Sequence, residues 1–138
     1  MNPLFPVKGH CLCGKVQLTV KAKSLNVGAC HCDMCRQWGG GPLMVVDCEE
    51  VSCEGGESVG VFASSDWAER GFCRECGTHL FYRLKEGGFY AVPVGLLEAV
   101  HDWQFAQQVF IDRKPGYYSF VEQTHNLTGE ELFAQFGQ

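Results

Sequence analysis

The sequence predicts a mainly β fold built from short antiparallel strands, and three observations support this. Apolar and polar residues alternate at period two, 17 glycines supply turns, and helical patterns are scarce. The chain has 138 residues, of which 46% are hydrophobic and 20% charged, and it shows no repeat or low-complexity tract. We therefore expect one domain covering residues 1–138, large enough to bury a core.

The clearest strand signal follows the N-terminal segment, where Val16, Leu18 and Val20 alternate with polar residues. Glycine pairs at 55–56 and 87–88 fall between apolar runs and predict turns. Further extended segments, rich in Val, Phe and Tyr, are predicted at residues 42–47, 59–63, 78–84, 88–94 and 108–111.

The C-terminus carries the clearest helix signal. Thr128 and Glu131 have the spacing of a capping box, in which each side chain bonds the other residue's backbone N–H. Leu132, Phe133 and Phe136 supply an apolar face behind it. We expect a short helix that packs on the sheet.

Charge and hydropathy argue against several classes of function. The chain has 11 Lys and Arg against 16 Asp and Glu, a net charge of −5, and no basic run for nucleic acid. Its longest near-apolar stretch, 91–97, is interrupted by Pro93 and Gly95, whereas a membrane span needs about 20 apolar residues. No secretory signal is visible at the N-terminus, so we expect a cytoplasmic protein without membrane or nucleic-acid partners.

Nine cysteines are the feature that points to function. An odd number cannot pair completely within one chain, and a reducing compartment disfavours structural disulfides. Seven of the nine lie in three short clusters, at residues 11–13, 30–35 and 73–76. This clustering predicts metal binding.

The first and last clusters predict a closed structural zinc site. Four thiolates hold a tetrahedral zinc best as two short pairs, since each pair brackets a tight turn. A glycine follows each pair and allows the backbone conformation that such a turn needs. The predicted ligands are Cys11, Cys13, Cys73 and Cys76. The alternative is that these residues are buried apolar cysteines or a redox pair.

The middle cluster offers three thiols, Cys30, Cys32 and Cys35, without an obvious fourth partner. A catalytic zinc keeps three protein ligands and leaves one position open, so this cluster predicts a second, catalytic zinc. Two alternatives stay open. Cys48 or Cys53 completes a second closed site, or the three thiols simply lie in a loop. Otherwise we expect Cys48 and Cys53 to be core residues.

The histidines beside the clusters receive no role from the sequence. In an extended Cys-x-Cys segment the central side chain points away from its neighbours, which argues against His31 as a ligand. His10 and His79 flank predicted ligand turns, where each is as well explained as an ordinary core or surface histidine.

Candidate substrate-binding residues follow the middle cluster. Arg36 could meet an anionic substrate, and Trp38 offers an apolar wall. Gly39 and Gly40 would let a ligand approach backbone N–H groups, although a plain turn before a strand explains the same residues.

The order of these motifs resembles the glutathione-dependent formaldehyde-activating enzyme family, also called the centromere protein V/GFA domain. The specific parts are C-x-C-G at 11–14, C-H-C-x-x-C-R at 30–36 and F-C-x-x-C-G-T at 72–78, and the match runs from residue 9 to about 118. Relatives often carry a histidine before a late Ile-containing strand, where this chain has Gln107 and Gln108. That difference falls where the substrate would sit.

The resemblance implies an Mss4-like β-tent with one structural and one catalytic zinc on the cysteines matching the two predicted sites. It also implies a carbon–sulfur lyase that joins glutathione and formaldehyde as an S-hydroxymethyl adduct, with small-molecule thiol and aldehyde substrates. A different class, a non-catalytic zinc-stabilised Mss4-like binding module, is the alternative. A methionine sulfoxide reductase relative would use two C-x-x-C turns, whereas the first cluster here is C-x-C.

Overall fold

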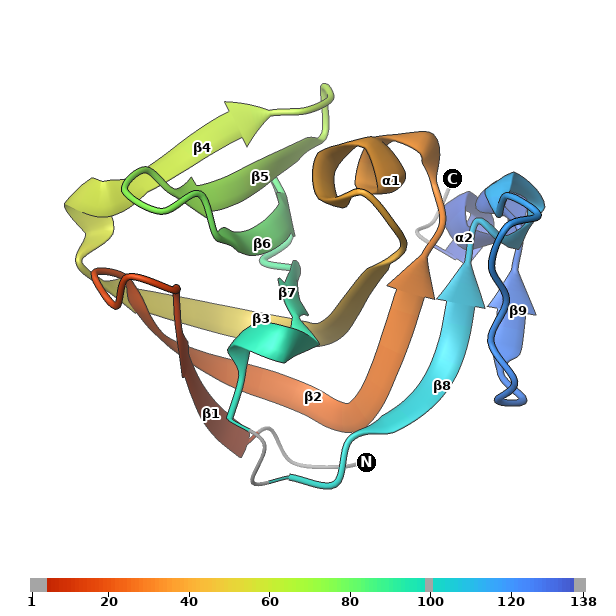
Figure 1. Cartoon of the computed structure of the whole chain (residues 1–138), viewed down its shortest axis with the longest axis horizontal. Coiled ribbons are helices and arrows are strands. Elements are labelled where there is room, and N and C mark those ends of the chain that lie inside the picture. Colours follow the sequence, from red (N-terminus) through yellow and green to blue (C-terminus); the bar gives the residue numbers. More distant parts are fainter. Residues whose placement is uncertain (1–4, 99–100, 136–138) are drawn as a thin grey trace. The chain divides into compact units, whose positions relative to one another are not determined.

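The computed structural model describes residues 5–98 and 101–135, and it is mainly β as predicted (Figure 1). These residues include two short α-helices, α1 (Asp33–Gly39) and α2 (Gly129–Gln135). The nine strands found in the described part of the chain are β1 (Phe5–His10), β2 (Gln17–Cys30), β3 (Leu43–Glu54), β4 (Val59–Ala63), β5 (Ala68–Cys73), β6 (His79–Leu84), β7 (Tyr90–Pro93), β8 (Gln104–Val109) and β9 (His125–Leu127). No helix among the described residues is both long and apolar enough to cross a membrane.

The chain forms two compact units, and β2 and β3 each contribute to both. Unit 1 contains residues 1–25 and 46–102, and unit 2 contains residues 26–45 and 103–138. A single domain over residues 1–138 therefore remains a prediction.

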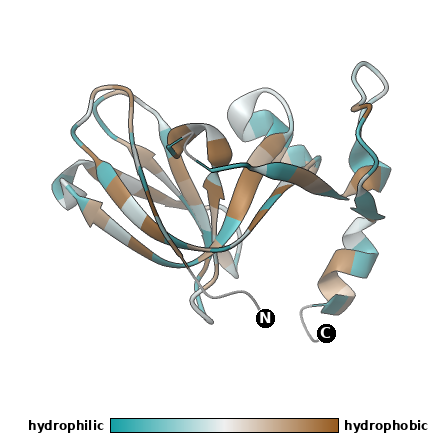
Figure 2. Cartoon of the chain, turned by 90° about the horizontal axis from the view of Figure 1, so that it is seen from below, coloured by the Kyte–Doolittle hydropathy of each residue, from teal (hydrophilic) through white to brown (hydrophobic). Residues whose placement is uncertain are grey.

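Unit 1 holds the larger part of the sheet. Its strands follow the order β4-β5-β6-β7-β3-β2, and β1 pairs with β2. The predicted alternation is confirmed in β2, where Leu18, Val20 and Ala22 are buried and the residues between them are exposed. Figure 2 shows the same change between apolar and polar colour along the strands. Burial of one face explains why this segment is extended.

Unit 2 contains two parallel ladders, where only antiparallel strands were predicted. The last residues of β2 pair with β8, and β8 pairs with β9. Parallel neighbours need a crossover of about a dozen residues or more, and residues 110–124 supply it between β8 and β9. Residues of this crossover also line a cavity.

Several predicted boundaries shift in the structure. β2 and β3 have 14 and 12 residues, longer than the short strands expected. The strand predicted at 108–111 lies at Gln104–Val109, because Phe110 takes a left-handed backbone conformation and a 3₁₀ turn follows. The sequence pattern missed β1, β5 and β9, which carry few consecutive alternating residues.

The predicted capping box is confirmed at the C-terminal helix. The Thr128 hydroxyl accepts from the backbone N–H of Glu131 at 3.1 Å, and the Glu131 carboxylate accepts from that of Thr128 at 2.8 Å. Phe133 packs edge-on against Phe110, with ring centroids 5.8 Å apart. Phe136, predicted for the same apolar face, lies outside the described residues.

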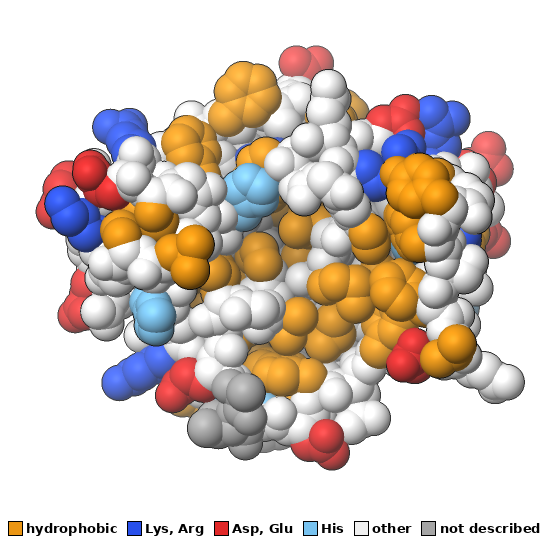
Figure 3. All heavy atoms as spheres, in the orientation of Figure 1, with side chains coloured by type: hydrophobic (Ala, Val, Ile, Leu, Met, Phe, Trp, Pro, Cys, Tyr) orange, Lys and Arg blue, Asp and Glu red, His pale blue; other side chains and the backbone are white. Residues whose placement is uncertain are grey.

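Charged side chains are mixed on the visible face. In Figure 3, Lys and Arg are interspersed with Asp and Glu, so this face carries no basic stripe.

Candidate metal centres

The four cysteines of the predicted structural site come together in unit 1. Cys11 and Cys13 lie in the turn between β1 and β2, Cys73 ends β5, and Cys76 lies in the turn before β6. The sulfur of Cys13 lies 3.6 Å from that of Cys11 and 3.8 Å from that of Cys73. All four sulfurs lie within 4.8 Å of one another. We call this group the quartet.

Both turns of the quartet close in the way the glycines predict. Gly14 and Gly77 each have a φ of +80°, a conformation that favours glycine. Their N–H groups donate back across the turn, to the carbonyls of Cys11 at 3.1 Å and Cys73 at 2.8 Å. The turns thereby point each pair of sulfurs to one place.

The quartet fits a tetrahedral zinc. Zinc–sulfur bonds of about 2.3 Å place neighbouring sulfurs about 3.8 Å apart, close to the distances present here. Thr78 lies 3.1 Å from the Cys76 sulfur, and hydrogen bonds from its hydroxyl and backbone lower the pKa of that thiol to about 5. The N–H of Val16 donates to the Cys11 sulfur at 3.4 Å. These donors favour thiolates, which are the form that binds zinc.

The three cysteines of the middle cluster come together in unit 2, and we call them the trio. Cys30 ends β2, Cys32 caps the N-terminus of α1, and Cys35 lies in that helix. Their sulfurs lie within 4.8 Å of one another. The Cys32 sulfur also accepts from the backbone N–H of Cys35 at 3.3 Å, so the first turn of the helix orients the Cys32 thiol.

Crowding of the trio favours a bound cation. Cys30 has a strongly raised pKa because the Cys32 and Cys35 thiols lie beside it and because it is buried. Three neighbouring thiolates repel one another, which favours the protonated thiols. A divalent ion between the sulfurs favours the thiolates instead. Three thiolates with an open position are the ligand set of a catalytic zinc, so the residues present fit such an ion.

Within the part of the chain that the structure describes, the trio has no fourth His, Cys, Asp or Glu in its cluster. Asp33 follows Cys32 directly, yet its carboxylate is held by Arg36 at 2.7 Å and by the guanidinium of Arg113. The hydrogen bond from Arg113 holds the pKa of Asp33 below its ordinary value. These ion pairs keep the Asp33 carboxylate engaged with two arginines.

The predicted substrate-binding residues lie in or directly after α1, for which the sequence predicted no helix. Arg36 donates to the carbonyl of His31 at 3.0 Å as well as to Asp33, so two of its nitrogens bond the chain itself. Trp38 is half-buried. Gly40 ends the helix with a φ of +84°, and its N–H donates to the Arg36 carbonyl at 2.7 Å. Contact of Arg36, Trp38, Gly39 or Gly40 with a substrate stays a prediction.

His31, Gln108 and Tyr118 form a hydrogen-bonded polar group that the sequence did not predict. His31 is fully buried, with Nδ1 2.8 Å from the Tyr118 hydroxyl and Nε2 2.8 Å from Oε1 of Gln108. Burial lowers the pKa of His31, which favours the neutral form of the ring. The group of thiols that could hold a metal ion does not include this histidine. Its partners lie 77 and 87 residues away, so local patterns carried no signal of this contact.

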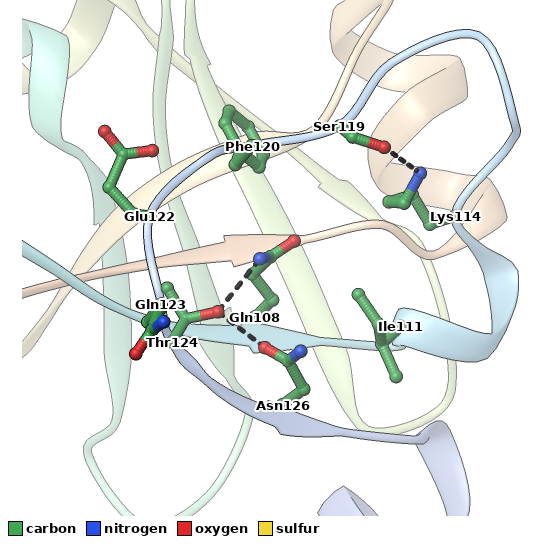
Figure 4. A pocket seen from close by; sticks show the side chains of 9 residues that line it. All are labelled: Gln108, Ile111, Lys114, Ser119, Phe120, Glu122, Gln123, Thr124 and Asn126. Carbon is green, nitrogen blue, oxygen red and sulfur yellow. Dashed lines mark hydrogen bonds between the residues drawn. The ribbon is translucent and has the colours of Figure 1, made fainter.

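Gln108 also lines a cavity of about 500 Å³ beneath the crossover from β8 to β9. Figure 4 shows its amide bonded to Thr124, and Thr124 bonded in turn to Asn126. The other lining residues are Ile111, Lys114, Ser119, Phe120, Glu122 and Gln123. The cavity walls are thus mainly polar.

The remaining cysteines lie in β3, outside both clusters. Cys48 is fully buried, and burial raises its pKa to about 12. Cys53 is half-buried and its pKa is raised by burial as well. His10 bonds the carbonyl of Cys11 at 2.8 Å through Nδ1.

Comparison with known proteins places the chain in a family. The sequence model described as "Glutathione-dependent formaldehyde-activating enzyme" matches residues 6–113, which include both cysteine groups. The chain belongs to the glutathione-dependent formaldehyde-activating enzyme family. The resemblance predicted from the motifs is therefore confirmed.

Three proteins similar to this chain accompany the family match. A Schizosaccharomyces pombe protein named as an uncharacterized lyase is 35% identical over 127 residues, covering 91% of this chain and 93% of that protein. A Phaeosphaeria nodorum protein carrying the family's name is 32% identical over 79 residues, covering 54% of this chain but 42% of that protein. The crystal structure of a Rhodobacter sphaeroides protein superposes with a TM-score of 0.59 at 27% identity, covering 68% of this chain and 90% of the other.

Proposed function

We propose that this family member is a zinc-dependent enzyme that joins a thiol such as glutathione to a small aldehyde such as formaldehyde. The observation that carries the proposal is the trio, whose three sulfurs lie within 4.8 Å of one another, with no fourth ligand in their cluster among residues 5–98 and 101–135. Family membership supports the substrate class. The reaction forms a carbon–sulfur bond, and in reverse it is a carbon–sulfur lyase reaction.

The proposed division of roles assigns one structural zinc to the quartet and one catalytic zinc to the trio. Cys30, Cys32 and Cys35 would hold the catalytic ion, which supplies a Lewis acid that lowers the pKa of a thiol reaching it. The quartet would contribute folding free energy only.

The chemistry needs few groups from the chain. The substrate thiol loses its proton to solvent, and its sulfur attacks the carbonyl carbon of the aldehyde. The new C–S bond forms as the carbonyl π electrons move to oxygen, which then takes a proton from solvent. Binding both reactants beside the trio supplies proximity, which alone removes a large part of such a barrier.

The proposal is tested by following adduct formation with a panel of thiols and small aldehydes by NMR exchange spectroscopy. We expect the zinc-loaded protein to accelerate the reaction for glutathione with formaldehyde or a close analogue. Cys32→Ser abolishes this acceleration while the fold and one zinc remain. Cys53→Ser, which removes a half-buried thiol outside both clusters, is the matched control and keeps full activity. Full activity of Cys32→Ser overturns the mechanism.

A zinc-stabilised binding module is the second candidate. Val61, Phe62 and Trp67 have exposed fractions of 42%, 64% and 52%, and the first two lie in β4 at one end of the strand order. Exposed apolar residues beside an edge strand favour protein contacts. This candidate gains support if no thiol and aldehyde of the panel reacts faster with the protein than without it.

A further inference from the structure

His31 lies within the middle cluster and is bonded through both its backbone and its ring. Its backbone N–H donates to the carbonyl of Val109 at 3.1 Å, and its carbonyl accepts from Nε of Arg36 at 3.0 Å. Both ring nitrogens are also bonded, to Tyr118 and to Gln108 at 2.8 Å each. Every polar group of this fully buried residue therefore has a partner.

The direction of the ring contacts follows from the side chains beyond them. Gln108 donates through Nε2 to the Thr124 hydroxyl at 2.9 Å, and Thr124 donates to Oδ1 of Asn126 at 2.6 Å (Figure 4). Gln108 thus presents its oxygen to His31, and an amide oxygen only accepts. Nε2 of His31 carries the proton, and Nδ1 accepts from the Tyr118 hydroxyl.

The crossover that supplies Tyr118 is itself held in place. The ammonium of Lys114 donates to the carbonyls of Pro115 and Tyr118 and to the Ser119 hydroxyl. The Tyr118 ring stacks on the imidazole with a centroid distance of 5.5 Å and an interplanar angle of 28°. The histidine ring is therefore fixed by stacking as well as by two hydrogen bonds.

Because His31 lies between two cysteines of the trio, fixing its ring also orients their side chains. His31 stands between Cys30 and Cys32, and Cys32 has an extended backbone with φ −64° and ψ 159°. Side chains alternate along an extended segment, so an imidazole fixed on one side directs the flanking side chains to the other. Holding the ring prevents the segment from rotating about its long axis.

We propose that His31 is the positioning residue of the trio, and that Tyr118 and Gln108 act on the trio through it. This inference rests on the proposed function only in taking the trio as a metal site. Groups beyond the ligands that hold a metal-binding segment in this way typically change metal affinity by about 10- to 100-fold when removed. The chain of bonds ends at Thr124 and Asn126 in the wall of the cavity.

The test uses metal release and cobalt spectra rather than enzyme activity. Tyr118→Phe removes the hydroxyl but keeps the ring, and Gln108→Leu removes the acceptor for Nε2. We expect both variants to release zinc from the trio about tenfold faster or more. The cobalt-loaded variants show shifted ligand-field bands for the trio and unchanged bands for the quartet.

Two further variants give the experiment its controls. Gln108→Glu keeps an oxygen acceptor for His31, and we expect it to restore slow release to within about twofold of the unaltered protein. Tyr117→Phe removes the hydroxyl of the adjacent tyrosine, which is 75% exposed, and leaves both release rates unchanged.

Unchanged release and spectra in Tyr118→Phe and Gln108→Leu overturn the inference. Equally faster release from the quartet and the trio also overturns it, since that result indicates general destabilisation. A different result would overturn the proposed function alone. In that case the two-zinc protein accelerates no thiol–aldehyde reaction, while these variants still change zinc release and the cobalt spectrum of the trio.

Discussion

The Sγ atoms of Cys13 and Cys73 lie 3.8 Å apart, although 60 residues separate them along the chain. Each belongs to a tight turn, one between β1 and β2 and the other between β5 and β6. A metal ion held there would join two distant hairpins of unit 1. The binding free energy of such an ion is partly folding free energy, and this leads to the first prediction.

Cys73→Ser should strongly destabilise the protein. Serine is a poor zinc ligand, and the three remaining thiols would be left crowded and unpaired with a cation. We expect a loss of more than about 3 kcal/mol of unfolding free energy, and a melting temperature lower by about 10 °C or more. Thermal unfolding measured by circular dichroism provides the test.

Cys53→Ser is the control for this loss, since Cys53 is half-buried and outside both clusters. A chelator strong enough to strip the quartet should lower the melting temperature of the unaltered protein to about that of Cys73→Ser. Equal melting temperatures for Cys73→Ser and the zinc-loaded parent would contradict a structural metal at the quartet.

The two sites should differ in how firmly they hold zinc. The quartet encloses its ion with four thiolates, whereas the trio leaves one position open to a competing chelator. Elemental analysis should find about two zinc ions per chain, and about one after mild chelation. Cys32→Ser should begin with about one zinc and lose little of it under the same treatment. Two ions of equal resistance would show that the trio is closed.

The capping box should stabilise α2 measurably. Thr128→Ala removes the acceptor for the Glu131 N–H, a bond of 3.1 Å, and loss of such a cap costs about 1 kcal/mol. The Leu132 amide, which donates to the Thr128 carbonyl at 3.0 Å, should then exchange with solvent deuterium about fivefold faster. Glu130→Ala, a substitution in the same first turn, should cost less than about half of the free energy that Thr128→Ala costs. The exchange rate of the Leu132 amide should therefore rise less in Glu130→Ala than in Thr128→Ala. The measurement is hydrogen exchange followed by NMR.

Cys48 should resist alkylation in the folded protein. It is fully buried, and its pKa of about 12 leaves very little thiolate at pH 8, because a raised thiol pKa favours the protonated form. With zinc protecting both clusters, iodoacetamide at pH 8 should modify Cys53 first and reach Cys48 only in denaturant. Peptide mass spectrometry identifies the modified residue. Modification of Cys48 before Cys53 would show that β3 opens readily in solution.

Local signals in the sequence were sufficient for several elements. Alternation predicted the extended segment at Leu18 and Val20, because one buried face imposes period two on a strand. The spacing of Thr128 and Glu131 predicted the start of α2, because a capping box is complete within four residues. Helix α1 was missed, because its seven residues, Asp33–Gly39, include a glycine and a tryptophan and show no amphipathic repeat.

The sequence by itself determined which cysteines group together. Each pair of cysteines and the glycine that follows it form a local pattern, and this pattern depends on the turn alone and not on the rest of the fold. Only the tertiary structure decided what surrounds them. The bonds of His31 to Gln108 and Tyr118 span 77 and 87 residues, and the parallel pairing of β8 with β9 carries Tyr118 back over the site. Contacts of this kind depend on how the strands are ordered in space, and no spacing along the chain encodes them.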